Sequence, residues 1–407
     1  MLGDGRVTQM KVLRIKKAAV VFAVVIVGCG FTACNFGSNQ SSIQPQEAIQ
    51  PSSESKQPEI DLPHQRYTMA AGKMGEEDCI YCYYVTEDGE LWRWIEGTTA
   101  YERIDTNVQD VSSPQDFIIV LKRDGTLYGE GQNIKHQLGV PLNPDSASEW
   151  EDYHIGHLLS DSEKASEQIL QNVKMVSVGR SHTIALKQDN TVWVWGENGD
   201  GQIGNGEPED GVRNNENLPV VERPTQVMSD CIFVAAGNSH SAAITETKDL
   251  YVWGDNSCGE IGNGERGNGF PTASNLMVTK PYLALKDVKW VRLLNVTTYA
   301  ITSDDVLWAW GKGYESTPQK VAADVKDVIG HGDEAAYLLD TGGKVYWTKE
   351  LFNLICDNVA AFDGKVGTVF SLIKKDGSLE VYTTDSLEGF IPEAPLLKQR
   401  LSDADFR

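Results

Sequence analysis

Basic residues are scarce in this chain, and the shortage excludes one class of function. The 407 residues hold 36 Lys and Arg against 58 Asp and Glu, a formal charge of −22. Five of the basic residues lie before residue 34, so the rest of the chain is more acidic still. Nucleic acid and anionic lipid headgroups repel a body of this charge, and we therefore expect no nucleic-acid binding.

Long apolar runs are also missing. The longest, residues 18–27, is too short to span a bilayer. Lys16 and Lys17 precede it and small residues follow it, which is the layout of an export signal over residues 1–33. The end of the run resembles a bacterial lipoprotein box. We favour Cys34 as the lipidated residue, with Cys29 as the alternative and an ordinary signal peptide as the third reading.

The next segment, residues 34–66, has few bulky apolar residues and is rich in Ser, Gln, Pro and Glu. This composition predicts a disordered tether that holds the folded part away from the membrane.

Catalytic and metal-binding motifs are missing as well. We find no Gly-x-Ser-x-Gly elbow, phosphate-binding loop or metalloprotease motif, so an enzyme is unsupported, although not excluded. Cys79 and Cys82 form a lone CxxC pair, and the pair His154 and His157 is equally weak. The loop 196–207 is similar to a calcium loop but begins with Gly where Asp is needed. We predict no metal and no cofactor.

Helical periodicity is weak, and a hairpin pattern recurs instead. An apolar strand, a tight polar turn and an aromatic strand follow one another in seven copies: residues 83–94, 117–131, 182–196, 240–254, 298–311, 335–347 and 370–382. Units that cannot bury their faces alone are typical of a propeller. We therefore predict an all-β, seven-bladed propeller over residues 67–390, followed by a tail at 391–407. Predicted inserts lie at 140–170, 207–226 and 265–285.

Two copies carry a sharper fingerprint. One has Gly179, His182, Trp195 and Gly196, and the next repeats these residues as Gly237, His240, Trp253 and Gly254. The copy before them keeps part of the pattern, with His136 where Gly is expected. The pattern resembles the regulator-of-chromosome-condensation repeat family, and the resemblance implies a seven-bladed propeller. Founding members of that family act as nucleotide exchange factors on chromatin, a setting that an exported acidic chain contradicts.

The repeated His and Trp residues have two interpretations. His182 and His240 recur at one repeat position, which favours a structural role, bonding backbone between strands, over catalysis. Eight of the ten Trp fall in the strand after the turn, where packing between blades is favoured over stacking on sugar.

The leading functional hypothesis is a lipid-anchored, non-catalytic surface platform that binds another protein through its loops. An acidic rim would suit a basic partner. Secreted relatives that inhibit β-lactamases support protein binding by analogy. The candidate contact residues are Trp150, Tyr153, Phe270 and Tyr314. The alternatives are a carbohydrate or cell-wall binder, a glycan-acting enzyme, and a structural spacer.

Overall fold

The computed structural model describes most of the chain after residue 69. The described residues are 70–73, 80–85, 88–95, 101–113, 117–140, 168–206, 212–213, 219–267, 276–331, 335–348, 353–365, 369–376, 378–383 and 397–400. Among them no helix is long and apolar enough to cross a membrane.

The described strands form seven sheets, which we number in chain order. Sheet 1 contains β1 (Ala70–Lys73), β2 (Ile80–Val85), β3 (Leu91–Ile95) and β4 (Tyr101–Asp105). Sheet 2 contains β5 (Val108–Ser112), β6 (Phe117–Lys122) and β7 (Leu127–Gly131). Sheet 3 contains β8 (Val173–Val178), β9 (His182–Lys187), β10 (Val192–Glu197), β11 (Val212–Arg213) and β12 (Pro219–Met228). Sheet 4 contains β13 (Cys231–Ala236), β14 (His240–Thr245), β15 (Leu250–Gly254) and β16 (Val278–Leu285).

The last three sheets have four strands each. Sheet 5 contains β17 (Val288–Leu294), β18 (Thr297–Thr302), β19 (Leu307–Gly311) and β20 (Gln319–Ala322). Sheet 6 contains β21 (Val325–His331), β22 (Ala335–Asp340), β23 (Val345–Trp347) and β24 (Asn353–Cys356). Sheet 7 contains β25 (Val359–Lys365), β26 (Val369–Lys374), β27 (Ser378–Thr383) and β28 (Leu397–Arg400).

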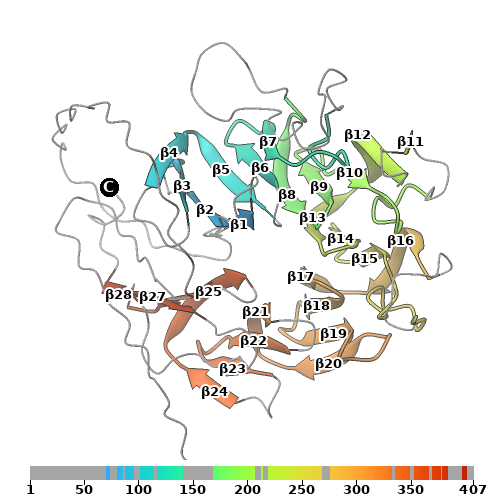
Figure 1. The fold of residues 1–407 in the computed structure, drawn as a ribbon. Helices are drawn as coiled ribbons and strands as arrows, with labels where there is room; N and C mark the ends of the chain where they lie inside the picture. Colours follow the sequence, from blue (N-terminus) through green and yellow to red (C-terminus); the bar gives the residue numbers. More distant parts are fainter. Residues whose placement is uncertain are drawn as a thin grey trace, which may run out of the picture.

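The sheets follow one another around a common axis, with first strands such as β13, β17 and β21 nearest the centre (Figure 1). Each predicted hairpin supplies two adjacent strands of one sheet, as β14 and β15 do in sheet 4. The prediction of an all-β fold is confirmed.

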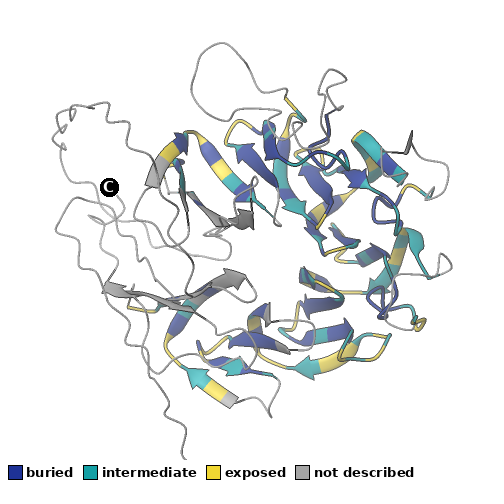
Figure 2. Ribbon diagram, in the orientation of Figure 1, coloured by how far each residue is buried: buried dark blue, intermediate teal, exposed yellow. Residues whose placement is uncertain are grey.

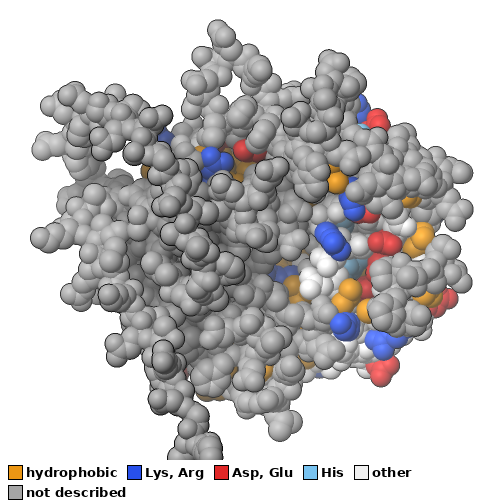
Figure 3. Space-filling model, in the orientation of Figure 1, with side chains coloured by type: hydrophobic (Ala, Val, Ile, Leu, Met, Phe, Trp, Pro, Cys, Tyr) orange, Lys and Arg blue, Asp and Glu red, His pale blue; other side chains and the backbone are white. Residues whose placement is uncertain are grey.

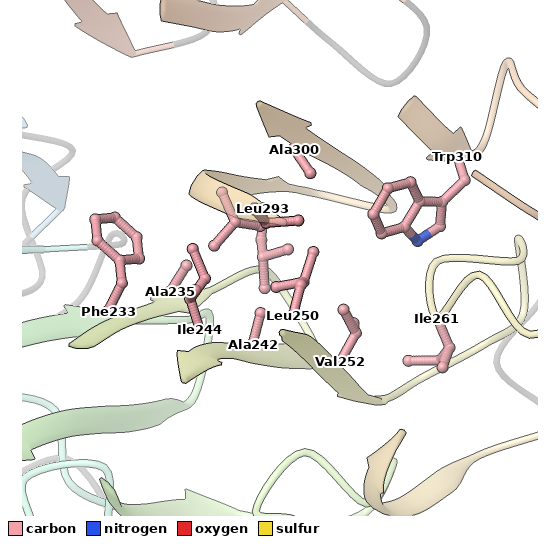
Figure 4. Close-up of a cluster of buried hydrophobic side chains, with 12 residues drawn as sticks. Phe233, Ala235, Ala242, Ile244, Leu250, Val252, Ile261, Leu293, Ala300 and Trp310 are labelled. Carbon is pink, nitrogen blue, oxygen red and sulfur yellow. The ribbon is translucent and has the colours of Figure 1, made fainter. Parts of the chain in front are cut away.

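The hydrophobic core is divided into separate clusters, each of which lies between two consecutive sheets. Six clusters of buried apolar side chains each join residues of two consecutive sheets. The cluster between sheets 4 and 5 packs Leu250, Val252 and Ile261 against Leu293 and Trp310 (Figure 4). Buried residues accordingly gather along the second and third strands of the sheets, such as β14 and β15 (Figure 2), because each sheet presents one face to either neighbour.

Consecutive sheets are also joined through their hairpin turns. The turn residue Asn190 is left-handed, with φ 65°, and its carbonyl accepts the backbone N–H of Cys231 at 3.0 Å. Five equivalent bonds between other sheets measure 2.8–2.9 Å. The left-handed turn positions are Gly89, Gly125, Asn190, Lys248, Asp305 and Gly343.

This connectivity gives the molecule two distinct faces. Each inner strand begins beside the hairpin turn of the preceding sheet, so all the turns lie on one face, which we call the turn face. The loops between first and second strands, and between third and fourth strands, lie on the opposite face, which we call the loop face.

The outer strands correct the predicted boundaries. β12 and β16 occupy the C-terminal parts of the predicted inserts 207–226 and 265–285. Ile169 and Leu170, at the end of the predicted insert 140–170, bond the backbone of Leu127. β28 pairs with β27, so the predicted tail 391–407 contains a strand of sheet 7. β12 and β16 are mostly half-buried and lack clear alternation of buried and exposed residues, so the sequence pattern did not predict them.

Candidate functional site

The fingerprint loops share one internal scaffold on the loop face. In sheet 3, the Asn198 side-chain oxygen accepts the N–H of Ile203 at 3.1 Å, and Asn256 does the same for Ile261 in sheet 4 at 3.1 Å. In sheet 2, Asn133 accepts from Leu138 at 2.9 Å. The three loops are therefore superimposable position by position, even where their outward-facing residues differ.

A relay of hydrogen bonds ties each fingerprint loop to the next sheet. The carbonyl of Gln202 accepts the Ser241 hydroxyl at 2.8 Å and the Trp253 indole N–H at 3.0 Å. The Ser241 oxygen lies 2.9 Å from Nε2 of His182. Because the Ser241 proton is given to Gln202, His182 carries its proton on Nε2 and donates it to Ser241.

The relay recurs between sheets 4 and 5. The Glu260 carbonyl accepts the Thr298 hydroxyl at 2.9 Å and the Trp310 indole at 2.7 Å, and His240 Nε2 lies 3.3 Å from the Thr298 oxygen. The two His thus bond a side-chain hydroxyl of the next sheet, where the sequence suggested backbone groups.

The fingerprint glycines make room for this relay. A Cβ on Gly179 would lie 2.2 Å from Cε1 of His182, and one on Gly237 would lie 2.3 Å from Cε1 of His240. Gly196 and Gly254 are left-handed, with φ 106° and 114°. A side chain at any of these positions would displace a buried His or strain the backbone.

Burial decides the charge of the two His. Desolvation lowers the pKa of His182 to about 3 and that of His240 to about 3. Both side chains are almost fully buried and remain neutral near pH 7. Their geometry serves the contact between sheets.

His136 occupies the position of its fingerprint loop at which the repeat pattern has Gly, and its backbone is left-handed, with φ 56°. Its side chain is 4% exposed, and Nε2 lies 3.9 Å from a carboxylate oxygen of Glu222 in sheet 3. Burial lowers the pKa of His136, and the charge of Glu222 opposes that shift.

The Trp residues divide into buried and half-buried positions. Trp195, Trp253 and Trp310 are fully buried and cannot reach a ligand. Trp193 shares a cluster with Trp195, as the i, i+2 spacing predicts, and Lys187 lies over its ring at 5.2 Å.

Of the four candidate contact residues, the structure describes Tyr314. It is half-buried and packs edge-on against Tyr299, with ring centroids 5.9 Å apart. Burial raises the pKa of Tyr314. Its ring therefore forms part of an internal contact. Trp150, Tyr153 and Phe270 lie outside the described residues, as do Cys29 and Cys34.

The weak metal candidates acquire no support. Asn198, in the calcium-like loop, already uses its side-chain oxygen on Ile203. In the part of the chain that the structure describes, no group of three His, Cys, Asp or Glu could hold a metal ion. Cys231 and Cys258 are buried free thiols. Cys79, His154 and His157 lie outside the described residues.

The loop face also carries ionisable groups that the sequence analysis did not single out. Lys135, Glu197, Asp200 and Asp255 are half-buried there, and Glu260 is fully buried. A signal that could have found them is the reversal of charge at one aligned loop position, where Lys135 of one fingerprint loop corresponds to Asp200 of the next. Figure 3 shows Lys, Arg, Asp and Glu side chains side by side on the described part of one face.

An all-β arrangement of sheets around an axis, joined through repeated loops, defines the molecule as a β-propeller. The family model Regulator of chromosome condensation (RCC1) repeat matches residues 173–202 and 231–260, and a second model of that repeat matches residues 189–244. Residues 173–260 of this chain therefore contain RCC1 repeats, which confirms the resemblance to that repeat family.

Named relatives share only parts of their length with this chain. Human E3 ubiquitin-protein ligase HERC2 is 30% identical over 266 residues, which cover 61% of this chain and 5% of HERC2. The bovine secretion-regulating guanine nucleotide exchange factor is 29% identical over 161 residues, covering 38% of this chain and 31% of that protein. The crystal structure of human WBSCR16 matches the fold with a TM-score of 0.54 at 18% identity, covering 76% of this chain and 85% of WBSCR16.

Proposed function

We propose that this protein is an exported, lipid-anchored propeller of the bacterial cell surface that binds another protein through its loop face. The observation that carries the proposal is the placement of the inserts. The inserts follow Val140, Gly206 and Gly267. Each of these three residues lies in the loop after the third strand of its sheet, which is on the loop face. Loops that differ in length on one face of a repeated scaffold are where binding specificity is expected.

The scaffold beneath these inserts supports a binding role over a catalytic one. The buried His and Trp of the fingerprint are committed to contacts between sheets. We further propose that the seven sheets close into one seven-bladed ring, which would give the inserts a rigid base. The exchange activity named for the bovine relative is not carried over, because the similarity covers 38% of this chain.

The full chain, solubilised from its membrane in mild detergent, is the bait that tests this function. Bound material is captured at low and at high salt and identified by mass spectrometry. We expect a stoichiometric protein that salt releases, because screening weakens attraction to an acidic surface. Retention of wall glycan alone, unaffected by salt, would refute the platform and favour the carbohydrate binder.

The anchor needs a separate test. Cells that express Cys34→Ala should release the protein from the membrane fraction, whereas Cys29→Ala should leave it there. Metabolic labelling with a radioactive fatty acid measures the anchor directly. Release by Cys29→Ala alone would move the anchor to that residue, and labelling of neither cysteine would refute lipidation.

A further inference from the structure

Aligned positions on the loop face form a repeated contact between consecutive sheets. The backbone N–H groups of Lys135, Asp200 and Cys258 each donate to the side chain two residues later, at 2.9, 2.8 and 2.7 Å. These three residues therefore occupy one position of the fingerprint loop. Glu197 and Asp255 share a second position, because the N–H of each donates to the carbonyl of a residue in the preceding loop at 2.9 Å.

Between sheets 2 and 3, these two positions hold opposite charges. Lys135 Nζ lies 3.2 and 3.1 Å from the two carboxylate oxygens of Glu197. Both side chains are about four-fifths buried, so the ammonium group is held at a shielded site. This pair shows what the position can accommodate: one ammonium group facing one carboxylate of the next sheet.

Between sheets 3 and 4, the same two positions hold like charges. Asp200 stands where Lys135 stands, and Asp255 stands where Glu197 stands. Burial, and then the charge of Asp255, raises the pKa of Asp200 to about 6. Both residues are only half-buried, so a group from solution can reach them.

A third carboxyl group lies beside this pair, and one of its two oxygens has no donor among the described residues. Glu260 is fully buried, and its Oε1 atom has no hydrogen-bond partner among the described residues. After burial, the charge of Asp255 is the largest influence that raises the pKa of Glu260. Asp255 therefore lies close to two carboxyl groups, those of Asp200 and Glu260. Its own carboxylate oxygens accept the backbone N–H and the hydroxyl of Ser257, each at 2.9 Å.

We propose that the contact formed by Asp200 and Asp255 is a binding site for the side-chain ammonium group of a lysine on a partner protein. The partner's lysine occupies, from outside, the place that Lys135 occupies in the neighbouring contact. This site rests on the proposed function, since it supplies the chemistry by which the loop face recognises a protein. Ammonium has three donors, which suits several carboxylate oxygens in one place.

A labelled peptide tests the site directly. Fluorescein-labelled pentalysine is titrated into the full chain in detergent at pH 7.5, and binding is followed by anisotropy. We expect Asp200→Asn and Asp255→Asn each to weaken binding by about tenfold. The same peptide with every Nε acetylated should not bind. Binding of the acetylated peptide at equal strength would overturn the proposal.

A matched variant removes the effect of overall charge. Asp304→Asn also deletes one negative charge, at an exposed residue of a hairpin turn on the opposite face. We expect it to change pentalysine binding by less than about twofold. An equal loss in Asp304→Asn and Asp200→Asn would show general attraction to an acidic protein and would overturn the site.

A second variant fills the site from within. Asp200→Lys places an ammonium group opposite Asp255, as Lys135 stands opposite Glu197. The variant should keep or raise the unfolding temperature and abolish the Asp255-dependent part of pentalysine binding. A lowered unfolding temperature would contradict the equivalence of the two contacts and overturn the proposal.

The two proposals fail in different ways. A captured protein that binds Asp200→Asn as well as it binds the unaltered chain would keep the platform and refute this site. Pentalysine bound through Asp200, with no protein captured from cells, would keep the site and refute the platform.

Discussion

At the scale of single residues, the relay between sheets depends on keeping buried groups neutral. His182 and His240 donate through Nε2, and each ring must remain neutral because it is shielded from water. Glu260 is the opposite case. It occupies the loop position that Gln137 and Gln202 hold in the two preceding sheets, where an amide supplies both donor and acceptor. A carboxylate there is the less suitable group unless it is protonated.

Replacement of Glu260 by Gln should stabilise the protein increasingly as the pH rises. Burial raises the pKa of Glu260 to about 8 from an ordinary value of 4.5, so the folded state retains a proton that the unfolded state releases. Stability is therefore lost between pH 4.5 and pH 8, by up to about 1.4 kcal/mol per pH unit. Urea unfolding of both proteins at pH 5, 7 and 8.5 should show the difference growing and then levelling off. A variant less stable than the original at pH 8.5 would contradict this account.

Replacement of His182 by Gln should show the reverse dependence. Burial lowers the pKa of His182 to about 3 from 6.5, so below pH 6.5 the unfolded state takes up a proton that the folded state refuses. His182→Gln should be less stable at pH 7 by about 1–2 kcal/mol, because a buried hydrogen bond is altered. That deficit should shrink as the pH falls toward 4. His154→Gln is the control, and a deficit that does not depend on pH would refute the role of proton uptake.

At the scale of strands and turns, the hairpins could be predicted and the strands beside them could not. Alternating apolar residues around a tight turn identify β14 and β15 from sequence alone. The inner strands have a weaker signal. Each of six begins after a left-handed Asn or Asp, at 107, 172, 230, 287, 324 and 358. This recurrence is visible in the sequence, but its meaning depends on a bond to the preceding turn, which only the folded chain brings near.

The candidate site was predicted even less completely than the fold. The sequence identified His182 and Trp253 as repeat positions, but it did not identify the Ser241 hydroxyl and the Gln202 carbonyl as the groups that join them. The opposition of Asp200 and Asp255 was equally hidden, because residues 55 positions apart meet only through the packing of two sheets.

Truncation should distinguish the last strand from the tail that the sequence predicted. β28 pairs with β27 through four residues and forms the outer edge of sheet 7. A chain that ends at residue 396 exposes the edge of β27, and we expect its unfolding temperature to fall by several degrees, about 4 °C or more. A chain that ends at residue 401 keeps the pairing and is the control. Equal unfolding temperatures would show that β28 adds no stability.

At the scale of the whole molecule, stability and recognition are separated in space. The six apolar clusters and the bonds at the turns hold consecutive sheets together through residues that the structure describes. The loop face carries the inserts together with the uncompensated carboxylates. Because these contacts hold the sheets together, the loops can differ in length and sequence with little loss of folding stability.

Deletion of one insert tests this separation. Replacing residues 143–165 by eight Gly and Ser residues keeps Val140, which packs between sheets 2 and 3, and keeps Ile169 and Leu170, which bond Leu127. The unfolding temperature should change by less than about 2 °C, since none of the described contacts is removed. Protein capture by the loop face should fall. The same replacement of residues 269–274 is the control for a shorter insert. A protein that no longer folds would place part of sheet 2 inside residues 143–165, and a folded protein with unchanged capture would remove this insert from the binding surface.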